Sequence, residues 1–196
     1  NVGVKLYPCC ANNHTSLDAL ERIRTTHPSF RAQDVEKVVV RTTRTSTLHV
    51  GWPYVPETVT TAQMNLSYCL AASLTDGHFS VDQATETAIR RPDILEMARR
   101  IEVVEDSELE ALGDRYRYAI KLEFFLRDGS CLQEKLLQAK GSEEWPLTEA
   151  EIVSKFKLLA SKTLKPSQME RLLETVQGLE HAEDARILSR LATPTN

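Results

Sequence analysis

The sequence predicts an α+β protein, because a clear β-hairpin is followed by a C-terminal quarter that is helical throughout in its pattern. Residues 116–126 alternate apolar and polar side chains, Asp128-Gly129 supplies a tight turn, and residues 130–138 return as the second strand. After Pro146, Thr148 and Glu151 form a capping box ahead of apolar residues at helical spacing. The hairpin predicts an antiparallel sheet, and the capping box marks where the helical part begins.

Four elements are predicted before the hairpin. A helix is expected over residues 15–26 with Thr15 as its N-cap, and a strand over residues 35–45, which include three consecutive valines. Residues 61–74 alternate in a way that also suits a strand, but their length and the following Gly77 favour a buried helix. Pro92 is expected in the first turn of a short helix over residues 92–100.

Two more helices are predicted after the one that Thr148 caps. Ser167 and Glu170 form a second capping box, and a last short helix covers residues 184–191. The apolar faces of these helices are too wide to be covered by a pair of helices alone, so we expect them to need another surface.

The composition excludes several classes of protein. Apolar residues make up 41% of the chain and charged residues 27%, which is typical of a globular protein and not of a disordered one. The net charge of −4 and the lack of a basic run argue against nucleic acid as a partner. No apolar run reaches the about 18 residues that a membrane span needs. We therefore expect a small molecule or a protein as the partner.

The four cysteines have neither the spacing of a disulfide framework nor that of a zinc site. We expect reduced thiols, no bound metal, and an intracellular location, either cytoplasmic or mitochondrial.

Residues 5–15, Lys-Leu-Tyr-Pro-Cys-Cys-Ala-Asn-Asn-His-Thr, are the most informative stretch of the chain. A lysine, a proline-fixed turn, two cysteines and His14 precede the expected helix, and no acidic residue occurs before Asp18. Free N–H groups at a helix N-terminus together with a lysine and a histidine make a natural site for an anion such as a small polycarboxylate. The alternative reading is a strand, a turn and a helix with buried thiols.

The motif Lys-x-Tyr-Pro-Cys-Cys followed by His14 resembles the one that opens the C-terminal region of the MmgE/PrpD family of 2-methylcitrate dehydratases and cis-aconitate decarboxylases. The resemblance runs from about Lys5 to about Leu191. Shorter matches follow in the family's order: Gly51-Trp52, Pro56-Glu57, residues 62–71, Asp76-Gly77, Arg91-Pro92, Asp128-Gly129 and Pro146-Leu147-Thr148.

The resemblance implies a division of the chain into two parts. Residues 1–140 would be an α+β lid domain, and residues 146–196 would be C-terminal helices of a helical domain that this chain otherwise lacks. It also implies a homodimer, or association with a chain that supplies the helical domain.

The resemblance further implies a lyase that acts on a small polycarboxylate by acid/base chemistry, with no metal and no cofactor. Cations must face the substrate carboxylates, because developing negative charge is the main barrier. Three reactions remain open at this point: decarboxylation of a cis-aconitate-like substrate, dehydration of a 2-methylcitrate-like substrate, and epimerisation beside a carboxylate.

Five residues are candidates for the site. By the resemblance, Lys5 would bind a substrate carboxylate and His14 would bind one or move a proton. Cys10 stands at about the place where animal cis-aconitate decarboxylases have a histidine, and a thiol with a pKa of about 8.5 would be an imperfect proton donor there. His49 and Tyr54 lie near the position of an aromatic residue in the family's active site. By the resemblance, His49 would be a catalytic group and Tyr54 would bind the substrate.

A second reading belongs to a different class of protein. The family's other acid/base residues are expected in its N-terminal half, so this chain by itself would be a non-catalytic, lid-like module that completes its site with a partner. A start at Asn1 suggests a fragment or a processed chain.

Overall fold

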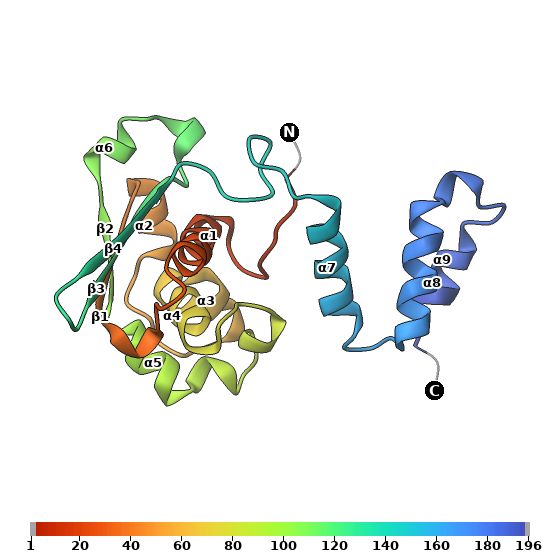
Figure 1. Ribbon diagram of the computed structural model, residues 1–196, viewed down its shortest axis with the longest axis horizontal. Helices are drawn as coiled ribbons and strands as arrows, with labels where there is room; N and C mark the ends of the chain where they lie inside the picture. The colour runs from red at the N-terminus through yellow and green to blue at the C-terminus, as the bar shows by residue number, and fades with distance from the viewer. Residues whose placement is uncertain (1–2, 195–196) are drawn as a thin grey trace. The chain divides into compact units, whose positions relative to one another are not determined.

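The computed structural model describes residues 3–194 and divides into two compact units, Asn1–Pro146 and Leu147–Asn196 (Figure 1). The first unit combines helices with a four-stranded sheet, and the second is built from helices. The predicted α+β class is thus confirmed. The assignment of the two parts to a lid domain and to a helical domain stays a prediction. Residues 1–2 of the first predicted part and residues 195–196 of the second lie outside the described residues.

The sheet has the strand order β2-β1-β3-β4. β1 pairs with β2 in parallel and with β3 antiparallel, and β3 and β4 form the antiparallel hairpin. Val38 lies opposite both Ile101 of β2 and Phe124 of β3, so the three strands share one apolar row. The strand bounds are β1 (Val35–Thr42), β2 (Ile101–Glu105), β3 (Ile120–Leu126) and β4 (Cys131–Leu136).

Helices cover one face of this sheet (Figure 1). Leu20 and Ile23 of the first helix pack with Val38, Leu122 and Phe124 into a single buried core. The helices of the first unit are α1 (Ala11–Thr26), α2 (Arg44–Val50), α3 (Val59–Met64), α4 (Leu66–Asp76), α5 (Pro92–Ala98) and α6 (Ser107–Glu110).

The opposite face of the sheet carries ion pairs. Lys37 on β1 pairs with Glu102 on β2 at 2.7 Å, and Arg41 on β1 pairs with Glu123 on β3 at 2.7 Å. Alternation along β1 therefore separates an apolar row from a charged one, as expected for a sheet with one covered face.

The hairpin is confirmed, with a β3 that begins four residues later than expected, because Asp114–Tyr116 form a 3-10 turn. Gly129 has a φ of +86°, which suits the Asp-Gly turn. The strand expected over residues 35–45 ends at Thr42, since Thr43 caps α2 by accepting a hydrogen bond from the Ser46 N–H.

The start predicted for the first helix was wrong. α1 begins at Ala11 with Cys10 at its N-cap, and Thr15 is fully buried inside the helix. Residues 12–16 form a polar run. It is helical because tertiary contacts bury it, among them the bond from the Asn13 amide to the Gln63 carbonyl at 3.1 Å.

The single helix expected over residues 61–74 is two helices, α3 and α4, which join at Asn65. The Asn65 side chain accepts from the Tyr68 N–H at 2.9 Å as the N-cap of α4, and its amide donates to the Trp52 carbonyl at 2.7 Å. Gly77 ends α4 with a φ of +85°, as predicted.

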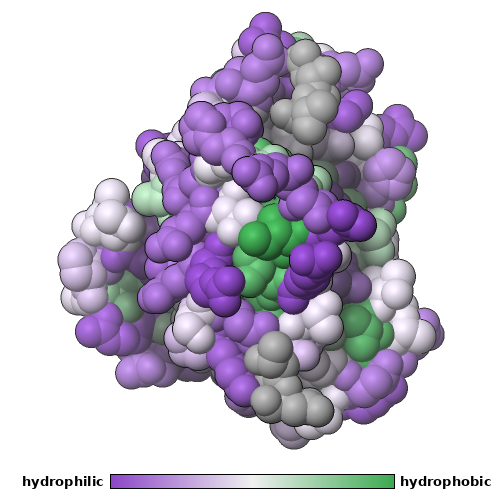
Figure 2. Space-filling model, turned by 90° about the vertical axis from the view of Figure 1, so that its right-hand side faces the viewer, coloured by the Kyte–Doolittle hydropathy of each residue, from purple (hydrophilic) through white to green (hydrophobic). Residues whose placement is uncertain are grey.

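The second unit contains α7 (Glu149–Ala160), α8 (Pro166–Gln177) and α9 (Arg186–Ala192). The capping box of Thr148 and Glu151 is confirmed, whereas α8 is capped at Lys165 and not at Ser167, because Pro166 fits its first turn. Figure 2 shows apolar side chains framed by hydrophilic ones on the face that it views. Large apolar residues exposed in the second unit are Ile152, Leu158, Leu159, Val176 and Leu179.

The two ends of the first unit lie side by side. The Val4 N–H donates to the Gly141 carbonyl at 3.0 Å, and a Cβ on Gly3 would lie only 2.9 Å from that oxygen. Among residues 3–194, no helix is long and apolar enough to cross a membrane.

The replacement Asn65→Ala is expected to lower the free energy of unfolding by about 2 kcal/mol, because it removes a helix cap and leaves the half-buried Trp52 carbonyl unpaired. Thr58→Ala is the matched control, since Thr58 caps α3 at an exposed position, and it should cost about 1 kcal/mol or less. Denaturant unfolding measures both. Equal losses would show that the bond to Trp52 contributes nothing.

Candidate active site

The positive charge of Lys5 lies at the N-terminus of α1. Lys5 is exposed, and its ammonium donates to the Cys9 carbonyl at 3.0 Å, one residue before the Cys10 N-cap. No acidic side chain lies in the first turn of α1. The lysine charge and the positive end of the helix dipole therefore add at one place, which favours a bound anion.

Cys10 is half-buried at this helix start, and a short chain of contacts leads from it to α2. Its thiol lies 3.7 Å from the Asn12 Oδ1, and the Asn12 amide donates to the Ser46 hydroxyl at 3.4 Å. His49 is exposed one helical turn after Ser46. The fold thus brings Cys10 and His49, which are far apart in sequence, to neighbouring helix segments.

His14 lies beneath this surface and not on it. It is 3% exposed, and its ring packs edge-to-face against Tyr7 with the ring centroids 5.2 Å apart. Its Nε2 is buried without a hydrogen-bond partner in the part of the chain that the structure describes. Direct contact between His14 and a bound molecule therefore requires an opening of the loop that carries Tyr7.

A buried carboxylate fixes that loop. The Tyr7 hydroxyl donates to Asp18 Oδ1 at 2.9 Å, and the Lys140 N–H donates to Asp18 Oδ2 at 2.7 Å. Burial raises the pKa of Asp18, against the opposite effect of these two hydrogen bonds. Burial, followed by the Asp18 charge, raises the pKa of Tyr7, so its hydroxyl stays protonated and donates.

Cys9 is a functional candidate that sequence reasoning missed. A hydrogen bond from Cys69 is the largest cause that lowers the pKa of the Cys9 thiol, to about 6, and His14 and Lys5 lower it further against the effect of burial. Burial and the same bond raise the pKa of Cys69. The surroundings of the pair therefore favour the ionised form at Cys9 and the neutral thiol at Cys69.

Nothing in the sequence separates Cys9 from a cysteine that only fills space. Its partner Cys69 is 60 residues away on α4, where the Asn13 amide donates to its sulfur at 3.4 Å. The motif quoted above contains Cys9, and this was the only available signal.

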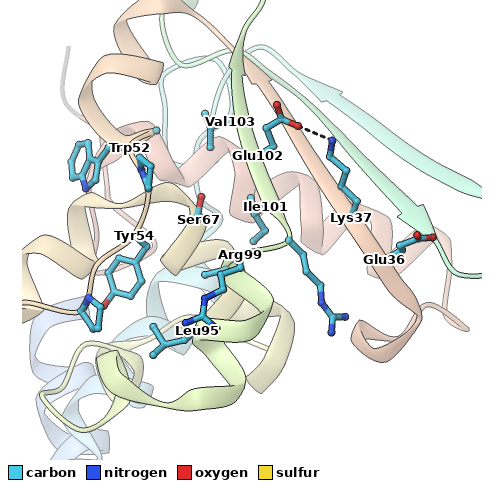
Figure 3. Close-up of a pocket in the computed structure, with 15 residues that line it drawn as sticks. Glu36, Lys37, Trp52, Tyr54, Ser67, Leu95, Arg99, Ile101, Glu102 and Val103 are labelled. Atoms are coloured by element: carbon cyan, nitrogen blue, oxygen red, sulfur yellow. Dashed lines mark ion pairs between the residues drawn. The ribbon is translucent and has the colours of Figure 1, made fainter.

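Tyr54 does not join the start of α1. Its hydroxyl donates to the Ile89 carbonyl at 3.1 Å, its ring packs on Tyr68 with the centroids 4.7 Å apart, and it lines a groove beside β2 (Figure 3). Among the residues that the structure describes, no three His, Cys, Asp or Glu side chains are grouped to hold a metal ion.

The chain matches the model of the MmgE/PrpD C-terminal domain over residues 7–181, and it belongs to this family. Its curated relatives include a cis-aconitate decarboxylase-like protein of Aspergillus oryzae, 28% identical over 197 residues, and a cis-aconitate decarboxylase of Aspergillus terreus, 26% identical over 201 residues. The cis-aconitate decarboxylase of Mus musculus is 26% identical over 196 residues. Each alignment covers 97% of this chain but only about 40% of the relative's length.

We expect Cys9 to make stability depend on pH. Its folded pKa of about 6 lies below the ordinary value of 9.0, so its contribution is complete above pH 9 and is lost as the pH falls towards 6. The difference in unfolding free energy between the parent chain and Cys9→Ala should therefore grow from pH 6 to 9, by at most ~1.4 kcal/mol per pH unit. Denaturant unfolding under reducing conditions measures it.

Cys131→Ala is the control for this experiment, because Cys131 is an exposed thiol on β4. It is expected to leave the pH dependence of the parent chain in place. A constant difference between the parent chain and Cys9→Ala over this range would show that Cys9 is not ionised in the fold.

Proposed function

We propose that this chain belongs to a metal-independent lyase that acts on a small polycarboxylate. Membership in the MmgE/PrpD family and the cis-aconitate decarboxylases among the relatives support this proposal. The structural observation that carries it is the Lys5 ammonium held over the start of α1 by the Cys9 carbonyl. Because the chain spans about 40% of the length of these relatives, the rest of the site would come from elsewhere.

In the proposed mechanism, Lys5 and the N-terminus of α1 hold one substrate carboxylate. Loss of CO₂ would leave a carbanion-like centre, and loss of hydroxide would follow removal of a proton beside a carboxylate. Both steps build negative charge, which a fixed cation stabilises. Cys10 and His49 are the accessible proton carriers. His14 would act through Cys9, because its ring is buried and it helps, after the bond from Cys69, to lower the pKa of that thiol.

Decarboxylation is the favoured reaction within this proposal, since the named relatives are cis-aconitate decarboxylases or resemble them. Two assays of the polypeptide that the source organism makes separate the two reactions. One measures release of CO₂ from cis-aconitate, and the other measures loss of water from 2-methylcitrate. Turnover of neither acid would count against both.

A second candidate function is a non-catalytic or partner-dependent module. The observation that favours it is the set of exposed apolar side chains on α7 and α8, such as Ile152 at 46% and Val176 at 50% exposure. A second copy of this chain, or a chain that supplies further helices, would cover them. Sedimentation of the chain, first alone and then mixed with the polypeptide that the source organism makes, tests this proposal.

Lys5→Ala is expected to lower kcat/KM for the polycarboxylate by about 100-fold, because a cation that faces developing charge is removed. Lys5→Arg should recover part of the loss. Lys135→Ala is the control, since Lys135 is an exposed lysine on β4. Steady-state kinetics with a check of folding by circular dichroism decides the matter, and unchanged kinetics in Lys5→Ala would remove this residue from the site.

A further inference from the structure

A groove of about 1090 Å³ lies beside the edge strand β2 (Figure 3). Besides β2, its walls come from the start of β1, the segment after α2, the start of α4 and the end of α5. The residues that matter for its chemistry are Trp52, Tyr54, Ser67, Leu95, Arg99 and Val103.

The apolar side of the groove is held in place before any ligand arrives. Tyr54 is fixed by its bond to the Ile89 carbonyl and by its contact with Tyr68. The carbonyl of Trp52 accepts from the buried Asn65 amide at 2.7 Å. Two half-buried aromatic residues, Tyr54 fixed by its side chain and Trp52 by its backbone, therefore line the groove, and aromatic residues are a usual lining of a site for a small organic molecule.

Ser67 is the polar group inside the groove. It is 5% exposed, and its hydroxyl has no hydrogen-bond partner among residues 3–194. It is the second residue of α4, an 11-residue helix, so it lies at the positive end of a helix dipole. Because Ser67 lines the groove, a ligand oxygen there can form a hydrogen bond with this hydroxyl.

Arg99 gives the groove its charge. Lys37 is paired with Glu102, and Arg100 is paired with Glu96, whereas Arg99 is exposed and makes no ion pair with any residue that the structure describes. Figure 3 shows Arg99 on the side of Tyr54 and Leu95, with Glu36 and the Lys37–Glu102 pair on the opposite side. An anion is therefore favoured at the aromatic end.

We infer that this groove binds a small oxyanion on a planar apolar body, an aryl carboxylate or an aryl phosphate. The ring lies against Trp52 and Tyr54, and the oxyanion lies between Ser67 and Arg99. The inference does not depend on the proposed lyase activity, because it concerns binding to this unit alone.

Trp52 supplies the readout. The chain has two tryptophans, so Trp145→Phe leaves Trp52 as the single reporter of the groove. Titration with benzoate and with phenyl phosphate should quench its fluorescence to saturation, and neutral benzyl alcohol should not. Saturation by only one of the two anions supports the site and identifies the head group. Calorimetry on the parent chain should give the same Kd.

Variants in the same background test the assigned contacts. Arg99→Gln should weaken binding of the anion about 10-fold, and Ser67→Ala about 5-fold. Arg171→Gln is the matched control, because Arg171 is an exposed arginine on α8, and it should leave Kd unchanged. The inference is overturned by absent saturation in a folded chain, by equal binding of benzyl alcohol, or by an Arg99→Gln variant that binds as the parent does.

Discussion

The first unit depends on the buried carboxylate of Asp18. Its two oxygens hold the loop before α1, through Tyr7, and the segment after β4, through the Lys140 N–H. A buried carboxylate stays ionised only when donors surround it, so both segments must be in place together. The loop that Tyr7 anchors also carries Lys5, Cys9 and Cys10. One carboxylate thus fixes the position of the candidate site without taking part in it.

The thiol pair shows how the same core sets chemical properties. Cys9 lies in the loop before α1 and Cys69 lies on α4, which packs against α1, and the Asn13 amide contacts both the Gln63 carbonyl and the Cys69 sulfur. The lowered pKa of Cys9 favours a negative charge near the buried imidazole of His14. Substitutions at Asn13 or Cys69 are therefore expected to change the candidate site through the ionisation of Cys9.

Local chemistry in the sequence predicts the elements whose geometry is set locally. The Asp128-Gly129 turn, the Thr148 cap and the Gly77 stop need only neighbouring residues, and all three occur as expected. The start of α1 and the break at Asn65 depend on partners about 50 and 13 residues away, which no local pattern reveals. The motif identified Lys5, Cys10 and His14, but the burial of His14 and the role of Cys9 require the fold.

The hydrogen bond between the Val4 N–H and the Gly141 carbonyl has a consequence for the chain as a whole. Because residues 4 and 141 lie side by side, a host polypeptide can carry residues 4–141 as an insertion between two adjacent positions. Such an arrangement adds little loop-closure entropy to the host fold.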